Sequence, residues 1–300
     1  MLNAGRHEGD PRHPRYADYL RIRGEITYEA AYLDERAYQV TAAHLVAGVI
    51  PKRKVPLGIR LRQLESVAKA HPNVSHLPVM VGRVKAVLAA RNDVMHPFAL
   101  TGGAFRFDRT ADNGVGRTYF SVAEVEEVRD GLTAASDVAD MIIGHSRSPR
   151  VADDPDRARY LELLGRVHVE SDWLFTGLID VLRNLGNHDE RELRLHGVDA
   201  LRGLLRELIL SWPRENEPLK NLYRQTAEVN SLRNRIVHAR PMEGHAYKLV
   251  SPESGYFDVA NWEDLLLLAV VLKQVWLLAD NVVKDNAKNG GFSSRPMRAD

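Results

Sequence analysis

Apolar residues recur at helical spacing along most of the chain, and turn-forming stretches divide this pattern into eight long segments. In the third segment, Met80, Val84, Val87 and Leu88 fall on one side of a helix with a period of 3.6 residues. We therefore expect an all-α protein. The predicted helices cover about Tyr16–Ala47, Leu57–Ala70, Leu77–His96, Val122–Ile143, Pro155–Leu185, Gly197–Ser211, Leu219–His238 and Val259–Lys284.

Two shorter segments interrupt the helices with the character of β-hairpins. Gly103–Phe120 carries Gly-Gly and Asn-Gly turn signals between apolar and aromatic positions, and Ala246–Phe257 carries the turn sequence Pro-Glu-Ser-Gly. Each of these segments follows a third helix and precedes a fourth. The order of elements is therefore the same in the two halves of the chain.

The sequence itself repeats with this order. Tyr19-Leu20 and Gly24 return as Tyr160-Leu161 and Gly165, 141 positions later. The motif Arg-Asn-x-x-x-His also occurs twice, once in each half. The sequence therefore predicts two copies of one domain in tandem.

We expect two helical bundles of about four helices each, related by a pseudo-two-fold axis. The predicted domains are 16–143 and 158–286, joined by a Ser-, Pro- and Asp-containing linker at 144–157. The polar residues 1–15 and the Gly- and Ser-rich residues 287–300 are predicted to be disordered tails.

The motif lies at the end of the third helix of each half. Its first copy is Arg91, Asn92 and His96, and its second is Arg233, Asn234 and His238. Arg91 shares the apolar stripe of its helix, a position that is costly for a charge unless it is paired or lines a cleft. Each histidine stands at a helix C-terminus, where the helix dipole favours its protonated form.

These residue types suit phosphate chemistry. Histidine can act as general acid or base near neutral pH, and arginine holds a phosphate with a forked pair of charged hydrogen bonds. Asparagine can orient the imidazole or a phosphate oxygen. Two such sets could cleave a phosphodiester without metal. The chain has no HExxH, P-loop or GxGxxG motif, so we expect no metal or other cofactor.

A structural reading of the motif stays open beside the functional one. Each arginine could form a buried ion pair, for which Glu29 and Glu170 on the first helices are candidate partners, and each histidine could cap its helix. Two copies at equivalent positions favour the functional reading. The histidines without a matched partner are predicted to be structural, and the tryptophans of the helices to be core residues. These are His44, His168 and His245, and Trp173, Trp262 and Trp276.

Composition limits the class of protein further. The 300 residues are 44% hydrophobic and 27% charged, as in an ordinary soluble globular protein, and the net charge is only +1, so an RNA site must be a local patch. The absence of cysteine excludes disulfides and thiol catalysis. Residues 1–15 lack the apolar core of a signal peptide, and the apolar run Leu265–Leu272 is too short to span a bilayer. We expect a cytoplasmic protein without a membrane partner.

The pattern Arg-[Asn/His/Asp]-x-x-x-His at the end of the third helix of a four-helix unit resembles the HEPN family, and the likeness covers roughly residues 16–286. Similar domains occur in toxins, abortive-infection proteins and CRISPR-associated ribonucleases. The resemblance implies that Arg91, Asn92 and His96 are catalytic, together with Arg233, Asn234 and His238. It also implies that the two motifs make one composite site.

The resulting expectation is a metal-independent endoribonuclease that acts in defence or stress, with RNA as substrate and a regulatory protein or nucleotide as a further partner. Oligomerisation is left open. The first alternative is a non-catalytic HEPN scaffold that binds RNA, a nucleotide or a partner protein. The second is a purely structural helical interaction module.

Overall fold

The computed structural model describes residues 16–45, 51, 55, 57–95, 98–99, 105–111, 114–118, 122–146, 154–194, 196–212, 216–237, 239–242, 247–250 and 261–288. The all-α class is confirmed, and the eight predicted helices are present with ends within four residues of those expected. They are α1 (Tyr16–His44), α2 (Leu57–Ala70), α3 (His76–Met95), α4 (Val122–Ile143), α5 (Pro155–Gly186), α7 (Val198–Ser211), α8 (Glu217–Val237) and α9 (Trp262–Lys288).

One further helix and five short strands complete the described part of the chain. The helix is α6 (Glu190–Leu193), which Asp189 caps by accepting hydrogen bonds from the backbone N–H groups of Arg191 and Glu192. The strands are β1 (Phe98–Ala99), β2 (Phe105–Ala111), β3 (Gly114–Thr118), β4 (Arg240–Pro241) and β5 (Leu249–Val250).

The first predicted hairpin is confirmed, and the second is paired differently from the prediction. β2 and β3 are antiparallel, with Phe107 opposite Thr118 and Ala111 opposite Gly114, and β1 adds a short third strand. β5 pairs with β4, which precedes the predicted hairpin. The predicted Pro-Glu-Ser-Gly turn lies outside the described residues.

The chain divides into two compact units whose limits differ from those of the repeat. The first unit comprises Met1–His168 and Asn234–Leu266, and the second comprises Val169–Arg233 and Leu267–Asp300. The first turns of α5 therefore belong with α1 to α4, although the repeat assigns them to the second half. α9 runs to Lys288, past the start of the predicted tail, and the rest of both tails lies outside the described residues.

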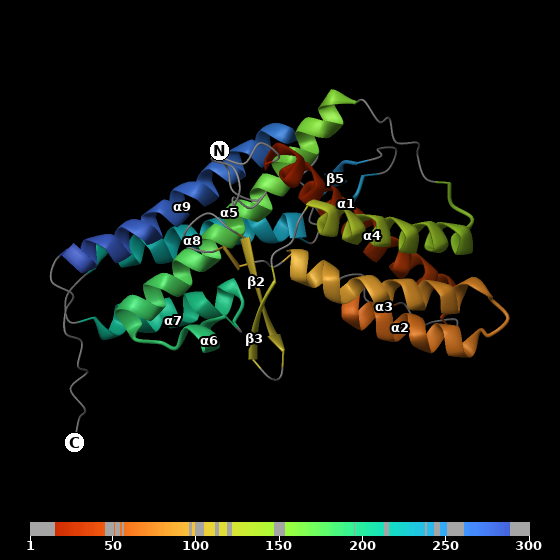
Figure 1. Ribbon diagram of the computed structural model, residues 1–300, viewed down its shortest axis with the longest axis horizontal. Coiled ribbons are helices and arrows are strands. Elements are labelled where there is room, and N and C mark those ends of the chain that lie inside the picture. The colour runs from red at the N-terminus through yellow and green to blue at the C-terminus, as the bar shows by residue number, and fades with distance from the viewer. Residues whose placement is uncertain are drawn as a thin grey trace, which may run out of the picture. The chain divides into compact units, whose positions relative to one another are not determined.

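In the first unit, α1 is the central helix. It contacts α2, α3 and α4 and the strand β4, and α2 and α3 lie side by side (Figure 1). Nine consecutive residues of α1, Ile22 to Ala30, are buried. A helix buried on every face must be surrounded by partners, so α1 organises the core of this unit.

α1 and the first half of α5 cross at two glycines related by the repeat. A Cβ atom on Gly24 would lie 2.9 Å from Cα of Leu161 and still closer to the Leu161 carbonyl group. A Cβ atom on Gly165 would meet the carbonyl group of Leu20 in the same way. Because Leu20 and Leu161 are themselves repeat counterparts, the contact is reciprocal. The matched sequences around the two glycines are thus explained by one close helix crossing.

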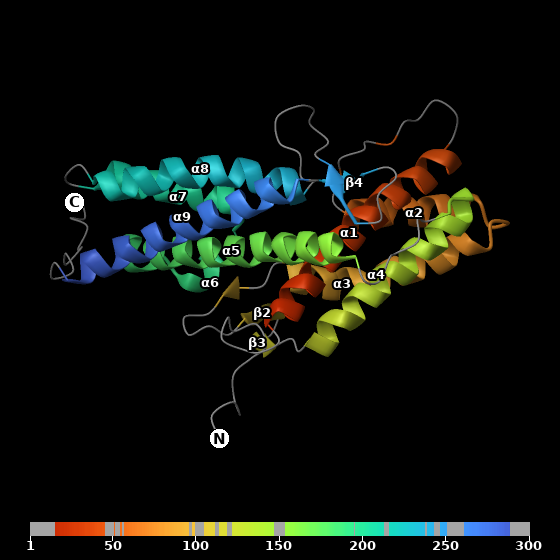
Figure 2. The ribbon, with the colours of Figure 1, turned by 90° about the horizontal axis from the view of Figure 1, so that it is seen from above.

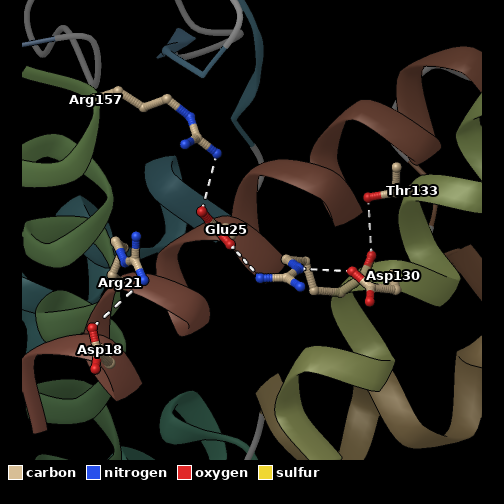
Figure 3. Close-up of polar contacts among 7 residues, drawn as sticks. Asp18, Arg21, Glu25, Asp130, Thr133 and Arg157 are labelled. Carbon is tan, nitrogen blue, oxygen red and sulfur yellow. Dashed lines mark hydrogen bonds and ion pairs between the residues drawn. The ribbon is translucent and has the colours of Figure 1, made fainter. Parts of the chain in front are cut away.

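A buried carboxylate also holds α1, α4 and α5 together (Figure 3). Glu25 on α1 accepts a hydrogen bond from Arg129 on α4 at 3.1 Å and another from Arg157 on α5 at 3.0 Å. Its side chain is 10% exposed, whereas that of Asp130, the other partner of Arg129, is 68% exposed. The pair of arginines satisfies the charge that burial of Glu25 would otherwise leave uncompensated.

In the second unit, the second half of α5 lies beside α7 and α9, and α8 lies beside α7 (Figure 2). Gly177 on α5 approaches Trp276 and Ala279 on α9, where a Cβ atom would be 3.1 Å from each side chain. Trp173 contacts Trp276 with ring centroids 5.3 Å apart. Both tryptophans are half-buried and contact each other between α5 and α9, so they are less buried than the core position predicted for them.

Among the described residues, α9 is long and apolar enough to cross a membrane by length and composition alone. Its most apolar window has a mean hydropathy of 1.8, and a third of that window is buried. Leu267, Val270 and Leu277 of this helix are exposed. Core helices of soluble proteins meet the same criteria, so the absence of a membrane partner stays a prediction.

Candidate functional site

The two motif arginines lie near the ends of equivalent helices. Arg91 is on α3, which ends at Met95, and Arg233 is on α8, which ends at Val237. Both side chains are half-buried, and the Nε atom of each is buried. This placement agrees with the predicted position of Arg91 on the apolar stripe, where Met80, Val84 and Val87 are buried.

The remaining motif residues are described only in part. Asn234 is half-buried on α8, and the backbone of Asn92 continues α3. His96 and His238 each follow the last residue of a helix and lie outside the described residues. The described parts of α3 and α8 thus reach the residue before each histidine, and the positions of the imidazoles stay predictions.

In the first unit, the carboxylate of Asp34 on α1 acts on Arg91. Removal from water lowers the pKa of the Arg91 guanidinium, and the charge of Asp34 opposes that shift. An arginine keeps its proton at any physiological pH even when its pKa is lowered. Arg91 is therefore a half-buried cation on α3 whose charged form Asp34 helps to stabilise.

Asp34 also faces Arg60 of α2. Arg60 Nε lies 3.9 Å from Asp34 Oδ1, and the Arg60 side chain is 0% exposed. Arg60 donates a hydrogen bond to Gln63 at 2.9 Å and lies 5.2 Å from the ring centroid of Tyr38. One carboxylate on α1 thus serves a fully buried arginine on α2 and the motif arginine on α3.

Burial changes the acidity of Asp34. Desolvation raises its pKa to about 6, against the opposing charges of Arg60 and Arg91 and with a smaller contribution from Glu35. The Oδ1 atom is buried, although the side chain as a whole is 37% exposed. Asp34 is therefore only partly shielded from solvent.

In the second unit, two carboxylates act on Arg233. Desolvation lowers the pKa of Arg233, and Asp172 of α5 and Asp199 of α7 oppose that shift. Asp172 is buried at 6% exposure. Asp199 is 71% exposed, pairs with Arg202 at 3.0 Å and accepts a hydrogen bond from the buried Asn230 at 3.0 Å. Both carboxylates thus favour the charged form of Arg233.

The acidic residues predicted to support the arginines are buried on the expected helices. Glu29 on α1 is 2% exposed and Glu170 on α5 is 8% exposed. Asp34 and Asp172, which act on the two arginines, were not predicted from the sequence. Arg60 was not predicted either, although it falls on the stripe formed by Leu57, Leu61 and Leu64 on α2.

The other singled-out histidines take structural positions where they are described. His71 Nε2 lies 2.7 Å from the carbonyl oxygen of His44, and His44 Nδ1 lies 2.9 Å from the carbonyl oxygen of Val40. His168 is buried at 3% exposure, and His245 lies outside the described residues. Within the described ranges, no group of three or more His, Asp or Glu side chains is arranged to hold a metal ion.

Comparison of the chain with protein-family models, with curated proteins and with solved structures finds no match. Arguments about function therefore rest on the residues and their surroundings. Arg91 and Arg233 can supply fixed positive charge near the helix ends that carry the histidines. Fixed positive charge of this kind can bind a phosphate and stabilise the charge on it.

Proposed function

We propose that the chain is a metal-independent endoribonuclease whose chemistry is carried by Arg91, Asn92 and His96, together with the matching residues Arg233, Asn234 and His238. The observation that supports this most is the duplication of the motif at the ends of α3 and α8. Each copy has an arginine turned partly into the helix interface and a histidine directly after the helix. A chance structural pair would not need all three residue types twice.

The proposed reaction is transfer of a phosphodiester to its own ribose. One imidazole takes the proton of the 2′-hydroxyl, the O2′–P bond forms and the P–O5′ bond breaks. The other histidine, as an imidazolium, donates a proton to the leaving O5′. The arginines stabilise charge on the phosphate oxygens. The products are a 2′,3′-cyclic phosphate and a 5′-hydroxyl, and the proton count balances without a metal.

The direct test is cleavage of an RNA oligonucleotide by the full chain in the presence of a chelator. RNA should be cut to products with cyclic phosphate ends, identified by mass spectrometry. DNA of the same sequence should survive because it lacks the 2′-hydroxyl. Cleavage that needs an added divalent ion, or that leaves a 5′-phosphate, would overturn the proposed mechanism.

The alternative is a non-catalytic scaffold that binds RNA, a nucleotide or a partner protein through the same residues. The surroundings of Arg233 support this reading, because carboxylates that favour the charged form of a partly buried arginine are typical of structural ion pairs. A scaffold should bind a 2′-O-methyl RNA but leave unmodified RNA intact. The HEPN resemblance adds a role in defence or stress to the proposal, and the composition and the polar N-terminal sequence add a cytoplasmic location.

A further inference from the structure

The helices α2 and α3 carry an excess of positive charge that the chain as a whole does not have. Together they hold six Arg and Lys residues and two Asp and Glu residues, whereas the net charge of the chain is only +1. The helix α4, which packs against α3, has the opposite composition, with one Arg and six Asp and Glu residues. The first unit therefore has a basic side at α2 and α3 and an acidic side at α4.

Three of the cations form an exposed set, which we call the basic face: Arg62 and Lys69 of α2 and Lys85 of α3. Arg62 and Lys69 are seven residues apart, so they lie on the same side of α2, two turns from each other. Glu65 lies between them in the sequence. Within the described part of the chain, neither Glu65 nor any of the three cations forms an ion pair or a side-chain hydrogen bond. The positive charge of the basic face is therefore not used inside the protein.

Lys85 lies on the side of α3 that faces α2. A Cβ atom on Gly58 of α2 would be 3.9 Å from the Leu88 side chain, and Lys85 precedes Leu88 by three residues, so the two are neighbours on the helix surface. The helices α2 and α3 lie side by side and are antiparallel (Figure 1). Arg62, four residues after Gly58, is therefore about level with Lys85. The basic face thus spans both helices.

Arg83 is also exposed, but it lies on the opposite side of α3. A Cβ atom on Gly131 of α4 would be 3.2 Å from the Val87 side chain, and Arg83 precedes Val87 by four residues. Arg83 therefore borders the acidic helix α4. An anionic chain is repelled on that side of α3 and attracted on the side of α2.

We infer that the basic face binds the phosphate backbone of the RNA substrate beside the first motif. The inference rests on the proposed function, because it names a further contact of that same substrate. The helix α3 joins the two places, since Arg91 follows Lys85 by six residues, a rise of about 9 Å. Neither α2 nor α3 contains a Phe, Tyr or Trp that could stack on a base. The basic face therefore contacts phosphates and does not select a base sequence.

Binding tests this contact without relying on cleavage. The probe is a fluorescein-labelled, single-stranded 2′-O-methyl RNA, which cannot undergo 2′-hydroxyl attack, and its affinity for the full chain is measured by fluorescence anisotropy over a series of KCl concentrations. The basic-face variant combines Arg62→Gln, Lys69→Gln and Lys85→Gln. The control variant has the same net charge, because it replaces three exposed cations of α6, α7 and α9 by Arg191→Gln, Arg206→Gln and Lys273→Gln.

The basic-face variant should bind the probe about 10-fold or more weakly than wild type, as expected for lost charged hydrogen bonds. It should also reduce the slope of log K against log salt by about 2, since each phosphate contact on a single strand contributes about 0.7. The control variant should keep the wild-type slope. Lys85→Gln alone should lower the slope by about 0.7, whereas Arg83→Gln on the same helix should leave it unchanged. Oligo-U and oligo-A probes should bind equally well.

A wild-type slope in the basic-face variant would overturn the inference, as would an equal loss of slope in the control variant. A wild type that binds phosphatidylserine vesicles but not the RNA probe would overturn it in favour of a membrane surface. A wild type that shows the predicted slopes but does not cut RNA would support the basic face and refute only the nuclease. A chain that cuts RNA while its basic-face variant keeps the wild-type slope would refute only the basic face.

Discussion

Asp34 carries a carboxylate that interacts with the motif arginine Arg91 and with the neighbouring Arg60. It faces Arg60 from α2 and Arg91 from α3, and burial raises its pKa to about 6. The position of Arg91 on an apolar stripe could be predicted from the sequence, because it depends only on spacing within one helix. The role of Asp34 could not be predicted, because no periodicity within α1 specifies which side chains of α2 and α3 come close to it.

The raised pKa of Asp34 gives a testable pH dependence. The folded-state value of about 6 lies above the unfolded-state value, so the folded protein holds this proton more tightly. The associated stability is complete at acidic pH and is lost as pH rises through the folded-state pKa. The Asp34→Asn variant has no carboxyl group to ionise at this position, so its stability does not contain this pH-dependent contribution. Between about pH 5 and 7, the wild type should therefore lose stability relative to the variant by on the order of 1 kcal/mol, since partial exposure screens the effect.

Urea unfolding of wild type and Asp34→Asn at several pH values measures this difference. Parallel pH profiles for the two proteins would show that Asp34 is not a source of the dependence. A variant that becomes less stable than wild type as pH rises would reverse the predicted sign.

At the scale of helices, the crossing of α1 and α5 explains why glycine returns at the same place in the repeat. Gly24 and Gly165 each leave room for the backbone of the other helix, at Leu161 and Leu20. The sequence shows the matched glycines but not the contact between them, because a repeat reports similarity and not proximity. The short helix α6 was missed for a different reason: four residues are too few for a helical period to be seen.

Gly24→Ala or Gly165→Ala should destabilise the protein by at least about 2 kcal/mol, because the new methyl group would overlap backbone atoms that cannot rotate away. Gly82→Ala is the matched control within α3, where no atom lies within 4 Å of the added Cβ. It should raise the stability by about 0.5–1 kcal/mol, the usual gain of alanine over glycine in a helix. Denaturant unfolding would contradict the close crossing if all three variants behaved alike.

The contact of Glu25 with two arginines makes a second prediction at this scale. Glu25→Gln should cost about 3 kcal/mol or more, because Arg129 and Arg157 both lose a largely buried ionic acceptor. Asp130→Asn removes the exposed partner of Arg129 and should cost less than about 1 kcal/mol. Similar melting temperatures for the two variants would show that the buried contact contributes no more than the exposed one.

At the scale of the whole molecule, the repeat and the compact units divide the chain differently. The repeat separates the halves near residue 150, whereas the first compact unit includes the start of α5 and the segment Asn234–Leu266. Composition and periodicity predicted helices and their order well, because both are local properties. They could not predict which helices form a unit, because that depends on long-range contacts such as those of Glu25 and the two glycines.

The same reasoning applies to the motif. Its duplication was visible in the sequence, but the carboxylates that act on Arg91 and Arg233 lie on helices α1, α5 and α7. Asp34, Asp172 and Asp199 each lie far along the chain from the arginine they influence. A proposal of two equivalent half-sites is what the sequence alone favours, and it stays a proposal.

The most direct test of the central claim is RNA cleavage with chelator present by four proteins: wild type, His96→Ala, His238→Ala and the variant lacking both histidines. His196→Ala, which removes an exposed histidine outside the motifs, is the control. If the two histidines serve one reaction as acid and base, each single substitution should reduce the cleavage rate by a factor on the order of 10² or more. The cleavage rate of the double variant should then be only slightly lower than that of either single variant. His196→Ala should cleave RNA at the wild-type rate. Two half-active single variants would instead indicate separate sites, and full activity without both histidines would contradict the account.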